Sequence, residues 1–314
     1  MEPLRIGLVG WGTVGSALGE LIERGPLPIA ISWVAVREPR RERGVPLPEG
    51  VPVSGEPGPM DEIDALVELA GSVTEPRRWA EQALEAGLPY VTANKALLAA
   101  HGAELADMAL LHDAALLASA SVGGGTPMLE VTEHLAASGR VTHLRGLLNA
   151  TTTFILSAMA DGQTYRDALG EAQSAGYAEA DPSFDVDGRD AAQKLAILAW
   201  VAWSTWIPEH EVETRGIRDV AVAPGSTVRL VADATPGSLR VSPTVLPAND
   251  PLAGASGIEC VLEIHSDAAG PLTIRGPGAG GPPTAGAVYA DLARLARGER
   301  PILGQRPAGS PVRV

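Results

Sequence analysis

Two lysines are the side chains of this sequence best suited to proton transfer. The chain has 314 residues and 24 basic side chains, of which only Lys95 and Lys194 are lysines and the other 22 are arginines. Arginine keeps its proton near neutral pH, whereas the pKa of a lysine amine shifts readily with its surroundings. Since arginine serves here wherever a surface cation suffices, the two lysines are the first candidates for chemistry that needs an amine. The alternative is that both remain by chance.

The segment that leads to Lys194 is rich in carboxylates. On a helix, Asp190 and Lys194 share a face because they are four residues apart. Five carboxylates follow Gly176 before the lysine, namely Glu179, Asp181, Asp185, Asp187 and Asp190. Their spacing does not fit a calcium loop, which needs a glycine at its sixth position and a terminal glutamate. We interpret the segment as a pocket for an ammonium group. A solvated acidic loop is the alternative, and it suits Asp181 and Asp187.

Lys194 also stands directly before the apolar run Leu195–Trp203. A lysine in that position is expected to be partly buried and to need a partner or a task.

A glycine turn near the amino terminus has the spacing of a phosphate-binding loop. Gly10, Gly12 and Gly15 follow the apolar run Leu4–Val9 and open a helical stretch that includes Thr13 and Val14. In such a loop the first glycine permits a tight turn, the second lets a pyrophosphate approach the backbone, and the third allows close packing of helix on strand. The helix amino terminus then faces the phosphates. The pattern predicts dinucleotide binding over a purely structural turn.

The residues after the second predicted strand indicate which dinucleotide binds. Val36 is followed by Arg37, with Arg40 and Arg41 close behind. A 2'-phosphate needs cations there, whereas an NAD site usually has an acidic residue. We favour NADP, and Glu38 keeps NAD open. A solvated basic helix start is the alternative.

Two further segments could approach a ligand. Lys95 follows the predicted strand Pro89–Thr92, so it emerges at the carboxyl edge of the sheet, where ligands bind in open α/β folds. An exposed lysine at a helix start is the alternative. The late glycine turn Gly278–Ala285 could bring backbone close to a nicotinamide or merely turn the chain, and the sequence leaves both open.

Strands alternate with helical patterns in the first part of the chain. The predicted strands are Leu4–Val9, Ala30–Val36, Ile63–Leu69 and Pro89–Thr92, with helices near Pro76–Ala86 and Ala96–His112. This order predicts a Rossmann-type parallel sheet covered by helices on both faces. The rhythm breaks at Ser121–Pro127. Later segments predict an α+β domain, and Pro283–Arg297 is a helix expected to return to the first domain.

Composition and charge exclude several classes of protein. The formal charge of −14 opposes binding to nucleic acid or anionic membranes. No apolar run is long enough to cross a bilayer, and the amino terminus lacks the pattern of a signal peptide. We therefore expect a cytoplasmic protein. Cys260, the single cysteine, excludes an internal disulfide or a thiolate metal cage.

These motifs together resemble the homoserine dehydrogenase family, in its short form without a carboxyl-terminal regulatory domain of the ACT (amino-acid-binding) type. The matching pieces occur in the family's order and span nearly the whole chain. They are Gly10–Gly15, Val91–Lys95, Ala120–Gly125, Leu148–Thr152, Gly176–Pro182 with Asp190 and Lys194, and Gly278–Gly280 with Thr284 and Ala285. The acidic segment with its lysine is the most specific of them.

The resemblance implies reversible NAD(P)H-dependent reduction of L-aspartate 4-semialdehyde to L-homoserine, in threonine, methionine and isoleucine biosynthesis. It also implies a homodimer. The expected domains are a dinucleotide-binding domain over residues 1–120, a substrate-binding and dimerisation domain over residues 121–282, and a return to the first domain with a tail over residues 283–314.

The resemblance also implies roles for individual residues. Lys194 would exchange a proton with the substrate oxygen, and Lys95 would contact cofactor and substrate. Substrate contacts fall on Glu179, Asp190, Tyr177, Thr151 and Asp185. Besides the Gly10–Gly15 turn, Arg37 and Arg40, cofactor contacts fall on Gly176, Gly278 and Gly280. A sodium ion would be held largely by backbone oxygens of Ser119, Val122, Gly124 and Thr126.

The sequence departs from the family pattern at a few positions. Ser119 stands where the family usually has Glu, Ala150 replaces a usual Gly, and Thr153 and Phe154 replace Asn and Tyr. No regulatory domain follows Gln305, so we expect no allosteric threonine inhibition through one.

Other functions remain as alternatives. They are a reductase of a related amino-acid aldehyde or 2-hydroxy acid, and an idle NAD(P)-binding sensor. A phosphorylating semialdehyde dehydrogenase is disfavoured because Cys260 lies in a strand-like run, away from any helix amino terminus that would activate it.

Overall fold

The structure is a computed structural model that describes residues 2–305, and these form two compact units. Of the described residues, the first unit contains 2–125 and 280–305, and the second contains Thr126–Ala279. The divisions expected after residues 120 and 282 lie a few residues from these. Residues 306–314 of the expected tail lie outside the described residues. None of the described helices is both long and apolar enough to span a membrane.

A six-stranded sheet forms the centre of the first unit, and all its paired strands are parallel. The strand order is β3-β2-β1-β4-β5-β6, which is the Rossmann order and agrees with the predicted Rossmann-type parallel sheet. The run Leu4–Val9 is apolar because a parallel sheet is buried on both faces. The strands are β1 (Leu4–Val9), β2 (Ile29–Ala35), β3 (Val53–Ser54), β4 (Ala65–Glu68), β5 (Tyr90–Thr92) and β6 (Leu116–Leu117).

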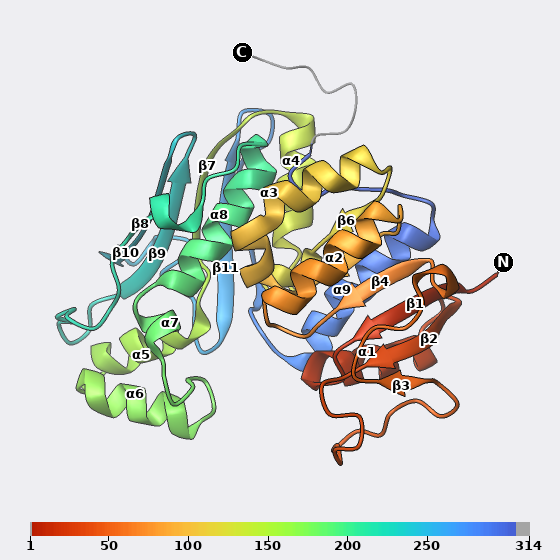
Figure 1. The fold of residues 1–314 in the computed structure, drawn as a ribbon. Helices are drawn as coiled ribbons and strands as arrows, with labels where there is room; N and C mark the ends of the chain where they lie inside the picture. The colour runs from red at the N-terminus through yellow and green to blue at the C-terminus, as the bar shows by residue number, and fades with distance from the viewer. Residues whose placement is uncertain (1, 306–314) are drawn as a thin grey trace. The chain divides into compact units, whose positions relative to one another are not determined.

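Four helices accompany this sheet, with two short 3-10 turns. They are α1 (Thr13–Arg24), α2 (Thr74–Glu85), α3 (Lys95–Leu111) and α9 (Gly281–Ala296), with η1 (Met60–Glu62) and η2 (Ser119–Ser121). Helix α9 packs against α1 (Figure 1), which confirms the predicted return of the last helix. Its side chains Val288 and Leu292 are buried in one core with Ile6, Leu8 and Leu18.

The second unit is built on a mixed sheet of order β12-β11-β7-β9-β10-β8, in which only the β10–β8 pair is parallel. This agrees with the predicted α+β architecture. The strands are β7 (Val141–Leu147), β8 (Glu213–Thr214), β9 (Val228–Thr235), β10 (Ser238–Val245), β11 (Glu259–Ser266) and β12 (Gly270–Pro277).

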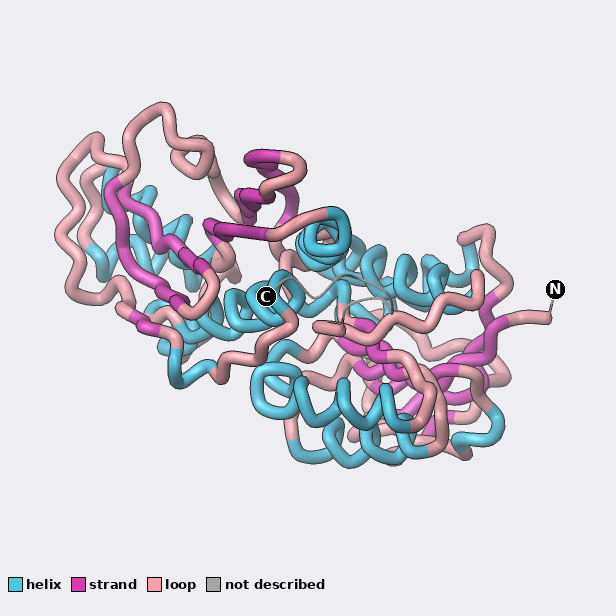
Figure 2. The backbone as a smooth tube through the Cα atoms, turned by 90° about the horizontal axis from the view of Figure 1, so that it is seen from above, coloured by secondary structure: helices cyan, strands magenta, loops and turns pink. Residues whose placement is uncertain are grey.

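Helix α8 is the central helix of this unit and packs on β7, β9 and β10. It ends at Trp203, because Ser204 adopts a left-handed conformation with φ of 53°. The helices are α4 (Met128–Ser138), α5 (Ala150–Ala160), α6 (Tyr165–Ser174), α7 (Ser183–Val186) and α8 (Arg189–Trp203), with the turn η3 (Glu209–Glu211). Figure 2 shows helices (cyan) beside the strands (magenta) of each unit.

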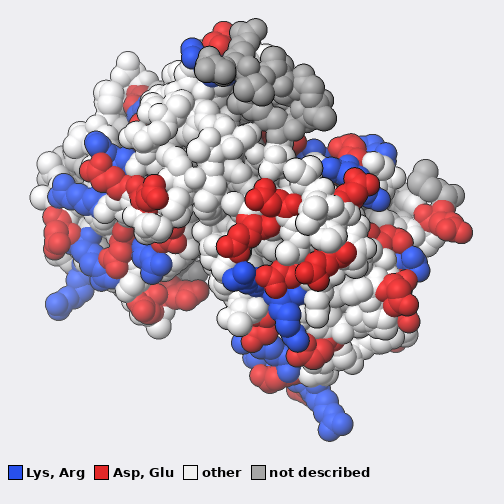
Figure 3. Space-filling model, turned by 45° about the horizontal axis from the view of Figure 1, so that its top comes forward, with Lys and Arg blue, Asp and Glu red and all other residues white. Residues whose placement is uncertain are grey.

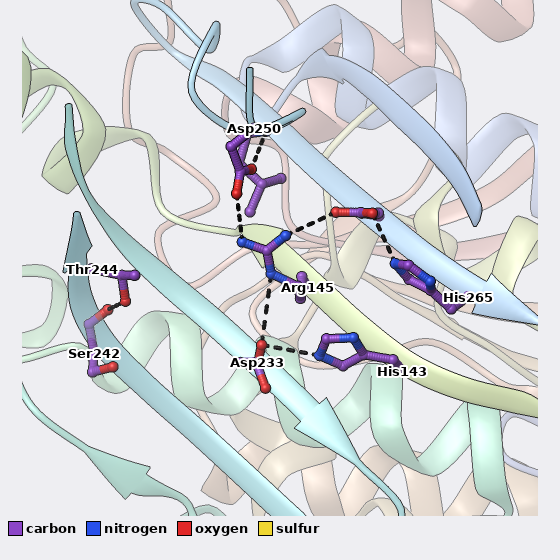
Figure 4. A network of polar contacts seen from close by, with 9 residues as sticks. His143, Arg145, Asp233, Ser242, Thr244, Asp250 and His265 are labelled. Carbon is purple, nitrogen blue, oxygen red and sulfur yellow. Dashed lines mark hydrogen bonds and ion pairs between the residues drawn. The ribbon is translucent and has the colours of Figure 1, made fainter. Parts of the chain in front are cut away.

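Arg145 of β7 centres a polar cluster on the second sheet (Figure 4). The strand register places it opposite Asp233 of β9 and Glu263 of β11. Its guanidinium donates to Asp250 at 2.9 Å and Glu263 at 3.1 Å and pairs with Asp233 at 3.7 Å. These cross-strand ion pairs tie the three central strands of the sheet together.

Acidic and basic side chains are interspersed over the face seen in Figure 3. The acidic excess of the chain therefore does not form one continuous acidic patch on that face.

Candidate active site

Lys194 lies in the buried part of α8, and its amine has two partners. Nζ donates to the carbonyl oxygen of Leu148 and to Asp190 Oδ2, each at 2.8 Å. The Lys194 side chain is 14% exposed and that of Asp190 is 6% exposed. Because Asp190 stands four residues earlier in the first turn of α8, the helix itself sets this ion pair. The burial and the partner agree with what the sequence predicted.

These surroundings raise the pKa of Lys194. Burial lowers this pKa, but the negative charge of Asp190 and the hydrogen bond to it outweigh the effect of burial. The amine is therefore an ammonium at neutral pH. Burial also raises the pKa of the nearby Cys260 thiol, against the opposing charge of Lys194. Cys260 therefore stays a neutral thiol beside the ammonium.

Asn149 connects Lys194 and its partner to the acidic segment. It caps α5, since its Oδ1 accepts from Thr152 N at 2.8 Å. Its Nδ2 donates to Asp185 Oδ1 at 2.7 Å and to Asp190 Oδ2 at 2.9 Å. One amide thus holds two carboxylates close together and fixes the oxygen that accepts from Lys194.

The acidic segment divides into two groups of carboxylates. Asp185 and Asp190 turn toward Asn149, as described above. Asp181 accepts from Ser183 N at 3.0 Å, and Asp187 pairs with Arg218, so both carboxylates make their contacts at the surface. The sequence assigned the same pair to a solvated loop.

Thr151 and Tyr177 lie together beside this network. Thr151 Oγ1 donates to the carbonyl oxygen of Tyr177 at 2.7 Å. Tyr177 is 43% exposed, and its ring packs on that of Phe154 at a centroid distance of 5.2 Å. Glu179 is exposed. Gly176 follows the end of α6 and has a φ of 75°.

The glycine turn of the first unit has the geometry that its spacing predicted. Gly10 has φ of 101°, and a Cβ there would lie 2.8 Å from the Leu69 carbonyl oxygen. A Cβ on Gly15 would lie 2.2 Å from the Gly10 carbonyl oxygen. By contrast, a Cβ on Gly12 would meet nothing within 4 Å. Gly10 and Gly15 are therefore required by packing, while Gly12 faces open space that a phosphate can enter. Thr13 and Val14 begin α1, whose first turn has no acidic residue.

Lys95 is the first residue of α3, at the carboxyl edge of the parallel sheet and half-buried. Asn94 precedes it as the helix cap and accepts from Leu97 N at 3.1 Å. Lys95 belongs to the first unit and Lys194 to the second. Arg37 and Arg40 are exposed just beyond β2, where cations can meet a 2'-phosphate.

The late glycine turn has packing reasons of its own. A Cβ on Gly278 would lie 2.1 Å from Cys260 Sγ, within the second unit. Gly280 has φ of 120° at the cap of α9, and a Cβ on Gly281 would lie 2.8 Å from the Thr13 carbonyl oxygen. Close packing alone is enough to explain Gly278 and Gly281. The approach of this turn to a nicotinamide stays a prediction.

The segment expected to hold sodium is a tight turn. Gly123 and Gly124 have φ of 83° and 59°, and such a turn can present successive carbonyl oxygens to a hard cation. The Ser119 hydroxyl is already committed, since it donates to the buried Asp291 at 2.5 Å. The sodium site of backbone oxygens from Ser119, Val122, Gly124 and Thr126 stays a prediction, and Thr126 belongs to the second unit. Within the described residues, no group of three or more His, Cys, Asp or Glu side chains could hold a metal ion.

Asn149 lies in the Leu148–Thr152 segment of the resemblance, but it was not predicted to be a site residue. The signal was present, since only three asparagines occur and two of them, Asn94 and Asn149, cap the helices beside Lys95 and the Lys194 site.

Two family models match the chain. Residues 10–118 match the model described as homoserine dehydrogenase, NAD binding domain, and residues 127–293 match the model described as homoserine dehydrogenase. The chain is 37% identical over 330 residues to the homoserine dehydrogenase of Corynebacterium glutamicum, covering 97% of this chain and 74% of that protein. It is 34% identical to that of Bacillus subtilis, covering 96% of this chain and 74% of that protein.

Solved structures show the same likeness. A homoserine dehydrogenase from Thiobacillus denitrificans has a TM-score of 0.90 at 32% identity, covering 99% of this chain and 79% of that one. A hyperthermophilic archaeal homoserine dehydrogenase in complex with NADPH has a TM-score of 0.83 at 28% identity, covering 96% of this chain and 99% of that one.

Proposed function

The chain belongs to the homoserine dehydrogenase family, and from this premise we propose how its residues perform the family's reaction. The reaction is the reversible NAD(P)H-dependent reduction of L-aspartate 4-semialdehyde to L-homoserine. The nicotinamide cofactor, when bound, supplies the hydride. The chain itself must bind and orient both molecules and move one proton at the substrate oxygen.

Lys194 is the general acid for reduction and the general base for homoserine oxidation. Its raised pKa makes it an ammonium at neutral pH, which suits donation of a proton to the developing alkoxide. In the other direction the deprotonated amine accepts the hydroxyl proton and becomes the ammonium again. Such help contributes roughly 10²- to 10⁴-fold to the rate. The hydrogen bonds to Leu148 and Asp190 hold the amine in one place.

The carboxylates around Asn149 bind the substrate ammonium group. Asp185, Asp190 and Glu179 supply negative charge, and Thr151 and Tyr177 complete the pocket. The bridge from Asn149 to Asp185 and Asp190 favours this role because one amide holds the two carboxyl groups close together.

NADP is the preferred dinucleotide. The phosphates meet Gly10, Gly12, Thr13, Val14 and Gly15, where only Gly12 faces open space. The exposed Arg37 and Arg40 meet the 2'-phosphate. Lys95, Gly176, Gly278 and Gly280 contribute further contacts to the cofactor.

Assembly and ion binding complete the proposal. The protein forms a homodimer through the second unit. Backbone oxygens of Ser119, Val122, Gly124 and Thr126 hold a sodium ion. The cytoplasmic location expected from the sequence stays a prediction.

The observation that carries this proposal is the pair of 2.8 Å bonds made by the Lys194 amine. The test is the initial rate of homoserine oxidation and of aspartate semialdehyde reduction, with NADP and with NAD. Turnover that is faster with NADP supports the proposal. Tight binding of NADP without turnover would favour an idle sensor.

A further inference from the structure

Glu68 is a fully buried carboxylate that the mechanism above does not use. It is the last residue of β4, at the carboxyl edge of the parallel sheet. Its Oε1 accepts from Ala70 N at 2.6 Å and from Gly71 N at 3.3 Å. Its Oε2 accepts from Thr92 Oγ1 at 2.8 Å and from the Tyr90 hydroxyl at 3.3 Å. A buried carboxylate is costly unless such donors satisfy it, and here both oxygens are satisfied.

The first pair of donors belongs to the loop that leaves β4. This loop lies against the dinucleotide turn, because Leu69 N donates to Val9 O at 2.8 Å and the Leu69 carbonyl oxygen touches the place of a Cβ on Gly10. By holding Ala70 and Gly71, Glu68 fixes the backbone that packs on the first glycine of the turn.

The second pair of donors belongs to β5, which leads to Lys95. While Thr92 Oγ1 donates to Glu68, it accepts from Asn94 N at 2.9 Å. Asn94 caps α3 and donates through Nδ2 to the Ser72 carbonyl oxygen at 2.5 Å, in the loop that leaves β4. The backbone on which Lys95 stands is therefore tied to Glu68 by one chain of hydrogen bonds.

We propose that Glu68 is a positioning residue for dinucleotide binding, which joins the two loops at the carboxyl ends of β4 and β5 and sets Lys95 and the rim of the Gly10 turn in place. This rests on the proposed role of Lys95 and the glycine turn in holding the cofactor. Glu68 does not touch the dinucleotide; it acts through Ala70, Thr92 and Asn94.

Thr92 offers the cleanest test, because Thr92→Val keeps the shape of the side chain and removes the hydroxyl that links Glu68 to Asn94. Thr92→Ser keeps that hydroxyl. The readouts are the Kd of NADPH from fluorescence titration of the full chain, kcat and KM for homoserine, and the thermal midpoint. We expect Thr92→Val to raise the Kd about three- to tenfold, in line with one net hydrogen bond, and Thr92→Ser to stay within about twofold of the parent. Glu68→Gln, which replaces one of these acceptor oxygens with an NH2 donor, should also raise the Kd.

Thr132 provides a matched control for stability. Its hydroxyl is equally buried and donates to Met128 O at 2.7 Å within α4 of the second unit. Thr132→Val should lower the thermal midpoint and leave the NADPH Kd unchanged. If Thr92→Val behaves in the same way, Glu68 is merely structural and the inference is overturned.

The parent protein separates this inference from the proposed function. A parent that neither binds NADPH nor oxidises homoserine removes the proposed function, and the inference with it. A parent that does both, with Thr92→Val matching it in Kd and kcat, removes the inference alone.

Discussion

Asp190 and Lys194 stand one helical turn apart on α8, and the carboxylate oxygen that accepts from the lysine is the same one that accepts from Asn149. The Lys194 amine is therefore held by Asp190, and Asp190 is held in turn by Asn149, which lies outside α8. Both the position of the proton donor and its pKa depend on this arrangement.

Lys194→Arg should keep the positive charge and lose most turnover, because a guanidinium does not give up its proton near neutral pH. We expect kcat for homoserine oxidation to fall about 10²- to 10⁴-fold, with the NADPH Kd close to that of the parent. Arg189→Lys is the matched control, since it makes the reverse exchange at the exposed start of the same helix. An unchanged kcat in Lys194→Arg would contradict the role of this lysine.

Asp190→Asn should move the pH dependence of aldehyde reduction. The charge of Asp190 raises the pKa of Lys194, and reduction needs the protonated amine, so removing the charge shifts the alkaline fall in kcat to lower pH. The measurement is kcat for reduction across the alkaline range. Asp187→Asn, which removes a surface partner of Arg218, should leave the position of that fall in place. A fall that stays where it was in Asp190→Asn would show that Lys194 is not the titrating group.

Two substitutions of Asn149 should separate its two tasks. Serine caps a helix about as well as asparagine, whereas alanine does not, at a cost of about 1 kcal/mol. Neither side chain reaches Asp185 and Asp190 as the Asn149 amide does. We therefore expect KM for homoserine to rise in both variants, and the free energy of unfolding to fall further in Asn149→Ala than in Asn149→Ser. Equal KM values in the parent and both variants would mean that the bridge has no part in substrate binding.

Gly278→Ala should destabilise the protein through one identifiable clash. The new methyl group would lie 2.1 Å from Cys260 Sγ, and overpacking of this kind costs about 1–3 kcal/mol. Cys260→Ala removes the sulfur, so the double variant should recover part of the loss. Urea unfolding of the parent, both single variants and the double variant gives the coupling energy. Strict additivity would mean that the clash is relieved elsewhere.

The sequence predicted the local parts of this fold well and the long-range contacts poorly. The glycine spacing and the apolar run before it identified β1, the Gly10 turn and α1, because these features act over a few residues. Asp190 and Lys194 could be paired because helical spacing alone brings them together. Asn149 could not be joined to Asp185, since that contact spans 36 residues and depends on how α5 and α7 pack. Glu68 could not be identified for the same reason. It lies within the predicted strand Ile63–Leu69, and its contacts with Tyr90 and Thr92 are not visible in the sequence.

Gly278 and Gly281 show a different limit. A glycine can be required by a bound ligand or by neighbouring protein atoms, and the contacts with Cys260 Sγ and the Thr13 carbonyl oxygen explain these two glycines without excluding a ligand. Glycine patterns of this kind show where another group comes close to the backbone. They do not show whether that group is a ligand or another part of the protein.

The first unit is interrupted in the sequence by the second, and α9 adds Val288, Leu292 and Leu295 to the core begun by Ile6 and Leu8. During synthesis from the amino terminus, every residue of the inserted unit is added before the first residue of α9. All strands of both sheets are therefore made before the last helix of the first unit. The nucleotide-binding half, although translated first, is the half that must wait for the end of translation.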